Sequence, residues 1–126
     1  MTPETTPFDA VPPGGAPVRR VPVAQLGDLP PGTMLMVQVD GTNILLVNQD
    51  GLHALQGTCS HEYFELDRGF LTGDAVTCAL HLSRFDLLTG DALDRPAELP
   101  LARYPVVVEG DTIILVLPVG EIPVNE

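Results

Sequence analysis

Residues 59–81 read CSHEYFELDRGFLTGDAVTCALH. This stretch holds both cysteines and two of the three histidines of the chain, arranged as Cys59-Ser60-His61 and Cys78-Ala79-Leu80-His81. Sixteen residues separate the two motifs. Each motif supplies one sulfur and one ring nitrogen. Two loops that meet at these motifs therefore offer two sulfurs and two nitrogens to a metal.

Two kinds of metal centre suit the donor set Cys59, His61, Cys78 and His81. A tetrahedral zinc ion accepts four such ligands. A diiron cluster accepts them in pairs, with both thiolates on one iron and both imidazoles on the other. Two ordinary buried thiols are the weaker interpretation, because each cysteine has a histidine two or three residues further along.

The flanking sequence predicts short strands separated by turns. The expected strands span residues 34–39, 42–47, 52–55, 75–77, 85–88, 104–108 and 112–117. Asp40-Gly41 and Asp50-Gly51 are typical hairpin turns. No segment shows three helical turns of apolar periodicity. We therefore expect an all-β fold, an antiparallel sandwich or barrel.

The first 18 residues differ from the rest, since they contain five of the 13 prolines together with Gly14-Gly15. This composition predicts a flexible or extended tail. No apolar run approaches the ~18 residues that span a bilayer. The N-terminus also lacks the pattern of a secretory signal, so we expect a cytoplasmic protein.

The acidic charge of the chain makes some classes of binding partner less suitable than others. Seventeen acidic residues face six basic ones, all arginine, which gives a formal net charge of −11. Nucleic acid and anionic membranes attract cationic proteins, so both are poor candidates. An acidic surface suits a protein partner with a basic patch.

The two motifs and their flanks resemble those of Rieske ferredoxins, especially the ferredoxin components of bacterial ring-hydroxylating dioxygenases. The resemblance covers about residues 19–118 and includes Phe85, four residues after His81. It also includes residues 69–73, which lead to the second ligand loop, and the turn Gly90-Asp91-Ala92. A proline loop at residues 95–101, with Pro96 and Pro100, belongs to it as well.

The resemblance implies an antiparallel β-sandwich with a small, loop-built cluster-binding subdomain at about residues 57–84. The tails are then residues 1–18 and 119–126. It implies one Rieske [2Fe–2S] cluster on Cys59, His61, Cys78 and His81, with Ser83, Phe85 and Pro96 around it.

The function implied is that of an electron-transfer protein rather than an enzyme. A monomeric one-electron carrier would pass electrons from a flavin-containing ferredoxin reductase to a terminal oxygenase. Apart from the four predicted ligands, only His53 remains to build a mononuclear iron site, and we expect His53 on a strand, exposed or half-buried. The alternatives are a Rieske-like small subunit of a reductase such as nitrite reductase, and a structural Cys2His2 zinc module.

Departures from the respiratory Rieske proteins are informative. Phe64 and Leu80 stand where those proteins carry two cysteines joined by a disulfide. Packing must then hold the loops, and Phe64, Leu66, Leu80 and Leu82 are available for it. Ser83 is retained, whereas Phe85 replaces a tyrosine.

Losing one hydroxyl donor near the sulfurs predicts a reduction potential at the low end of the Rieske range of roughly −150 to +300 mV. Four acidic residues lie near the motifs: Glu62, Glu65, Asp67 and Asp86. Their negative charge also favours a low reduction potential, and together they suggest an acidic docking rim for a partner around the predicted histidine ligands.

Overall fold

The fold is seen in a computed structural model that describes residues 17–59, 65–79, 82–94 and 99–125. These residues form ten strands and two short 3-10 helices. The first half contains β1 (Val18–Gln25), η2 (Leu26–Asp28), β2 (Thr33–Val39), β3 (Thr42–Asn48), β4 (Leu52–Gln56) and η3 (Leu66–Arg68). The second half contains β5 (Phe70–Thr72), β6 (Ala75–Thr77), β7 (Arg84–Asp86), β8 (Arg103–Tyr104), β9 (Val106–Glu109) and β10 (Thr112–Pro118).

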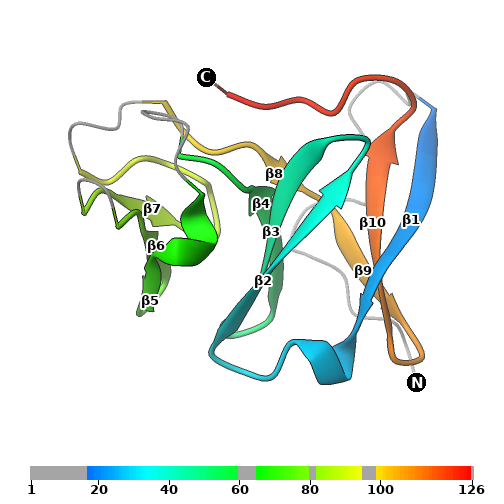
Figure 1. The fold of residues 1–126 in the computed structure, drawn as a ribbon, viewed down its shortest axis with the longest axis horizontal. Helices are drawn as coiled ribbons and strands as arrows, with labels where there is room; N and C mark the ends of the chain where they lie inside the picture. Colours follow the sequence, from blue (N-terminus) through cyan, green and yellow to red (C-terminus); the bar gives the residue numbers. More distant parts are fainter. Residues whose placement is uncertain (1–16, 60–64, 80–81, 95–98, 126) are drawn as a thin grey trace.

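The strands build three antiparallel sheets, in the orders β1-β10-β9, β2-β3-β4-β8 and β5-β6-β7. The first two sheets pack against each other, and the small third sheet lies to one side, beside β4 (Figure 1). The predicted all-β class and antiparallel sandwich with a smaller unit are confirmed. No helix among the described residues is long and apolar enough to cross a membrane.

Strand β3 is buried on both faces. One face packs in the core of the sandwich, and the other packs against the third sheet. Ile44 and Leu46 point into the core between the two larger sheets. Leu45 and Val47, which alternate with them, point to the opposite face. There they join Phe85 of the third sheet in a second apolar cluster. The third sheet is therefore fixed to the sandwich by an apolar cluster of its own.

The first predicted hairpin turn is confirmed. Asp40 and Gly41 both have positive φ, at 51° and 81°, between the paired residues Val39 and Thr42. A two-residue turn of this kind matches the right-handed twist of its strands, and aspartate and glycine tolerate its backbone angles. The turn thereby sets the register of β2 against β3.

Two predicted strands are placed differently. The run 104–108 is divided, because β8 pairs with β4 whereas β9 pairs with β10. Pro105 lies between them, has no N–H for a ladder, and marks the change of sheet. The run 85–88 ends early, because the Asp86 carboxylate accepts hydrogen bonds from the amides of Leu88 (2.7 Å) and Thr89 (3.2 Å). That local turn closes β7 at Asp86.

Candidate metal centre

The two cysteines follow strands of two different sheets and belong to one apolar cluster. Cys59 follows β4 and is 5% exposed, and Cys78 follows β6 and is 1% exposed. Neither cysteine forms a disulfide. They share their cluster with side chains such as Leu55, Leu66 and Phe85. Two thiol groups far apart in sequence thus lie in one water-poor environment.

The loop that carries Cys59 is closed at its base. Thr58 forms a β-bridge with Glu65, and the amide of Leu66 donates to the carbonyl of Gly57 at 2.8 Å. A Cβ on Gly57 would lie 2.5 Å from the Met36 sulfur and 2.8 Å from the backbone carbonyl carbon of Asn43, which cannot move aside, so this crossing favours glycine. His61 lies between these anchors but outside the described residues.

The loop that carries Cys78 is closed in the same way. The amide of Leu82 donates to the carbonyl of Cys78 at 2.9 Å, and the amide of Cys78 donates to the carbonyl of Ser83 at 2.8 Å. His81 lies inside this closed loop, outside the described residues. The expectation that Leu82 packs the loop is wrong, because its side chain is 62% exposed and its φ is 59°.

Of the residues predicted to surround the centre, some are buried in the structure and others lie outside the described residues. Ser83 and Phe85 are 1% and 0% exposed, and Phe85 belongs to the same cluster as the two cysteines. Leu66 is also fully buried there, as expected. Pro96, Phe64 and Leu80 lie outside the described residues.

His53 is buried rather than exposed or half-buried, so that expectation is wrong. Its ring Nε2 lies 3.0 Å from the carbonyl oxygen of Gln49, to which it donates in the neutral form. Burial lowers the pKa of His53, and nearby Arg103 adds to this effect, whereas Asp50 and Asp74 oppose it.

Acidic residues near the centre have mixed roles. Asp67 is exposed, and Glu65 lies 3.8 Å from the Arg68 guanidinium. The carboxylate of Asp86 closes the turn after β7, so it has a structural role. Glu62 lies outside the described residues. The predicted docking rim stays a prediction.

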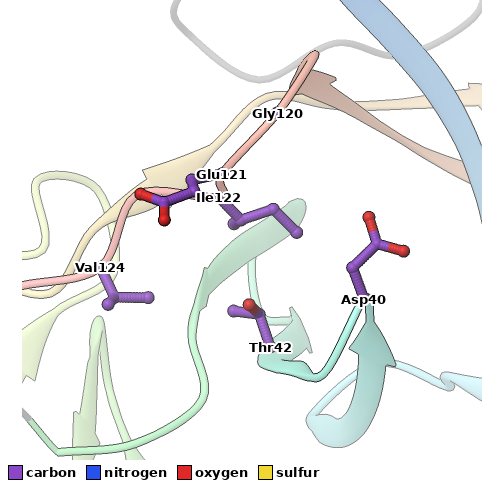
Figure 2. Close-up of a pocket in the computed structure, with 6 residues that line it drawn as sticks. All are labelled: Asp40, Thr42, Gly120, Glu121, Ile122 and Val124. Carbon is purple, nitrogen blue, oxygen red and sulfur yellow. The ribbon is translucent and has the colours of Figure 1, made fainter.

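A separate pocket lies at the β2–β3 turn and the chain that follows β10, with a volume of about 730 Å³ (Figure 2). Its lining includes the carboxylates of Asp40 and Glu121 and the apolar side chains of Ile122 and Val124. Its described lining includes no sulfur or imidazole, and it lies apart from the cysteine motifs.

Comparison with known proteins decides the family. The sequence model of the Rieske [2Fe-2S] domain family matches residues 19–105, which include both cysteine motifs. The chain belongs to the Rieske [2Fe–2S] domain family. The predicted family and its cofactor, one Rieske-type cluster, are confirmed.

Similar Rieske proteins are ferredoxin components. The ferredoxin component of biphenyl 2,3-dioxygenase from Rhodococcus jostii is 39% identical over 99 residues, covering 78% of this chain and 92% of the relative. The ferredoxin of carbazole 1,9a-dioxygenase from Nocardioides aromaticivorans is 36% identical, with a TM-score of 0.72 over 76% of this chain and 95% of that one.

Two further structures bear on the predicted partners. A chain in the complex of reduced oxygenase and oxidized ferredoxin of carbazole 1,9a-dioxygenase is 28% identical, with a TM-score of 0.72, covering 76% and 91% of the two chains. The small subunit of an NADH-dependent nitrite reductase from Mycobacterium tuberculosis is 22% identical, with a TM-score of 0.70 over 79% and 96%. That likeness shows the fold alone.

The residues of this Rieske domain fit the cluster that its family name implies. Two buried cysteines that form no disulfide share one cluster of apolar side chains, and the two loops that contain the histidines are each closed at the base. Within residues 17–59, 65–79, 82–94 and 99–125, no three metal-binding side chains gather. The cysteine pair is therefore the described part of the predicted ligand set.

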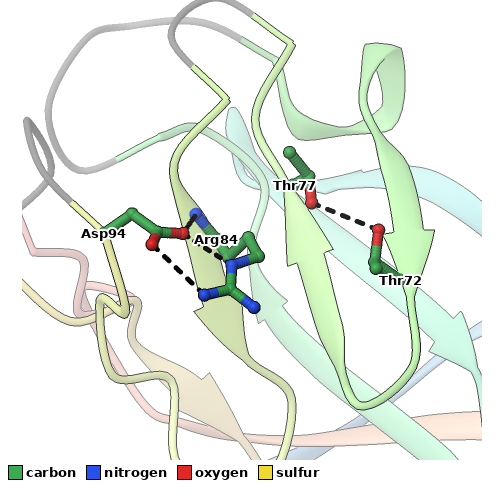
Figure 3. Close-up of polar contacts among 4 residues, drawn as sticks. All are labelled: Thr72, Thr77, Arg84 and Asp94. Carbon is green, nitrogen blue, oxygen red and sulfur yellow. Dashed lines mark hydrogen bonds and ion pairs between the residues drawn. The ribbon is translucent and has the colours of Figure 1, made fainter.

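Sequence reasoning missed the polar contacts that hold the surrounding chain. The Arg84 guanidinium and backbone amide both bond the Asp94 carboxylate, at the start of the segment that leads to the proline loop (Figure 3). Gln56, the last residue of β4, is 1% exposed, and its side chain makes four hydrogen bonds. A single arginine, aspartate or glutamine carries no motif, so neither contact has a sequence signal.

Proposed function

We propose that this Rieske protein is a one-electron carrier whose [2Fe–2S] cluster is held by Cys59, His61, Cys78 and His81. The supporting observation is the pair of buried cysteines, neither in a disulfide, on two closed loops that share one apolar cluster. When bound, the cluster supplies reversible one-electron chemistry. Relatives named as ferredoxin components agree with an electron-transfer protein rather than an enzyme.

The chain's own residues then have distinct tasks. Cys59 and Cys78 bind one iron as thiolates, and His61 and His81 bind the other as neutral imidazoles. Leu66 and Phe85, both fully buried, exclude water from the side of the cysteines. Two neutral ligands in place of thiolates reduce the negative charge of the site and raise its potential above that of an all-cysteine cluster.

The partners we propose are a terminal oxygenase and a flavin-containing reductase. Support for the oxygenase comes from the dioxygenase names of the relatives and from the oxygenase–ferredoxin complex described above. A carrier that meets two proteins in turn needs small, transient interfaces. We place this carrier in the cytoplasm as a monomer that binds neither membrane nor nucleic acid.

Two alternative functions predict different observations. A structural zinc module would be colourless and would lose its fold when zinc is removed. A nitrite reductase small subunit shares the fold, but the dioxygenase ferredoxins described above are more similar in sequence.

Metal analysis together with the visible spectrum tests the proposal. The freshly purified protein should contain two irons per chain and show visible absorption that dithionite bleaches with one electron per chain. One zinc per chain and no visible absorption would contradict the proposal.

A further inference from the structure

The side chain of Gln56 is a fully used amide at the base of the Cys59 loop. Its Oε1 accepts hydrogen bonds from the backbone amides of Ala102 (2.8 Å) and Asn125 (2.9 Å). Its Nε2 donates to the carbonyls of Thr58 (3.1 Å) and Asn125 (2.8 Å). A carboxamide has two donors and two acceptor positions, so every one of them is occupied.

The chain after β10 is held at this amide. Beyond β10 it runs across the sandwich towards the side where the third sheet lies (Figure 1). The hydroxyl of Tyr104 donates to the carbonyl of Pro123 at 2.6 Å, and Asn125 exchanges two backbone bonds with Gln56. The Asn125 side chain then donates to the carbonyl of Pro100 at 2.8 Å. Residues 121–125 are thus fixed at both Tyr104 and Gln56.

These contacts join three segments that lie far apart in sequence. Thr58 directly precedes Cys59. Pro100 belongs to the predicted proline loop, and the following residue, Leu101, is 2% exposed in the cluster that contains both cysteines. Gln56 and Asn125 therefore link the Cys59 loop to the segment whose Leu101 belongs to the apolar cluster of the two cysteines.

We propose that Gln56 is a positioning residue that, through residues 121–125, holds the Cys59 loop against the Pro100–Leu101 segment. The inference rests on the proposed function, because Cys59 needs exact placement only as a cluster ligand. As a consequence, residues 121–125 control how firmly the [2Fe–2S] cluster is retained and how well the chain around it is ordered.

Two substitutions separate this role from general stability. Gln56→Glu keeps the size and both accepting contacts but turns a carboxylate oxygen towards the carbonyls of Thr58 and Asn125. Asn125→Ala removes only the bond to Pro100 and leaves the two backbone bonds to Gln56. Gln25→Glu is the matched control, because Gln25 is an exposed glutamine with one side-chain donor bond, at 3.3 Å to Thr112.

The experiment measures, for the full-length proteins, the rate at which visible absorption is lost in the presence of a chelator. The electron paramagnetic resonance spectrum after dithionite reduction and the thermal unfolding midpoint are recorded alongside. One lost hydrogen bond favours local opening, so cluster loss should speed up about three- to tenfold in Asn125→Ala and at least about tenfold in Gln56→Glu. Both variants should also shift the resonance positions, whereas Gln25→Glu should match the wild type.

The outcomes are distinguishable. A wild-type protein without the visible bands would overturn the proposed function and this inference together. A wild type with the bands, and variants that match it in cluster loss and resonance positions, would overturn this inference alone. Unchanged resonances with lowered unfolding midpoints would also overturn it, because Gln56 would then have a purely structural role.

Discussion

At the scale of single residues, the two cysteines share a cluster of buried apolar side chains within the described part of the chain. Ser83 is 1% exposed, and its carbonyl already accepts the amide of Cys78. Phe85 is fully buried in the same cluster and offers no hydroxyl. Hydrogen bonds to sulfur stabilise the more negative, reduced state of such a cluster. This composition favours a potential at the low end of the Rieske range.

The Ser83 hydroxyl provides a direct test of this point. Replacing Ser83 by alanine removes one donor next to Cys78, so the reduction potential should fall by tens of millivolts, on the order of one hydrogen bond. Redox titration of both proteins, followed by visible absorption, measures the difference. An unchanged potential would mean that the hydroxyl makes no bond to the cluster.

His53 predicts a dependence of stability on pH. Its pKa is lowered in the folded protein, chiefly by burial, so below about pH 6.5 the unfolded chain takes up a proton first. The free energy of unfolding should therefore fall as the pH decreases from 6.5 towards the folded pKa. Above pH 6.5 the residue should contribute no such dependence.

Denaturant unfolding of the wild type and of His53→Gln between pH 5 and pH 8 measures this contribution. Other groups titrate in both proteins, so the difference between the two curves isolates His53. Parallel curves across the whole range would contradict a lowered pKa at this residue.

At the scale of elements, the backbone approaches itself closely where η3 leads into the third sheet. A Cβ on Gly69 would lie 1.8 Å from the carbonyl oxygen of Thr77, because η3 and β6 meet there without room for a side chain. A backbone oxygen cannot move aside as a flexible side chain can. The chain between η3 and β5 therefore passes close to the end of β6, the strand that leads to Cys78.

Gly69→Ala should lower the free energy of unfolding by about 2–3 kcal/mol, as for other overpacked sites. Gly27→Ala is the matched control, because no atom lies within 4 Å of its added Cβ. That variant should stay within about 0.5 kcal/mol of the wild type. Denaturant titration measures both, and equal stabilities of the two variants would contradict the close approach.

The strands that could be predicted from the sequence are those marked by neighbouring residues, such as an apolar run next to a turn. Strands β3 and β10 are apolar runs that begin after an acidic-glycine turn, so their positions followed from composition and turn chemistry. The first strand, β1, contains Pro22 and a bulge beside it, which obscured its alternation. Gln56 had no signal, because its role depends on segments that only the fold brings together.

At the scale of the whole molecule, the charge of −11 governs encounters with partners. A partner with a basic patch is attracted over a distance that salt shortens. The second-order rate of electron transfer to the oxygenase partner should therefore fall as the ionic strength rises from about 0.01 M to 0.5 M. Stopped-flow absorption measures the rate, and a rate that is constant or rises with salt would contradict electrostatic attraction.

The central claim is that two thiolates and two imidazoles of this chain bind one diiron cluster. Electron–nuclear double resonance of the dithionite-reduced protein, labelled with ¹⁵N-histidine, tests it most directly. We predict one unpaired electron per chain coupled to two histidine nitrogens. A paramagnetic cluster without histidine coupling, or a chain with no paramagnetic signal and one bound zinc, would contradict the account.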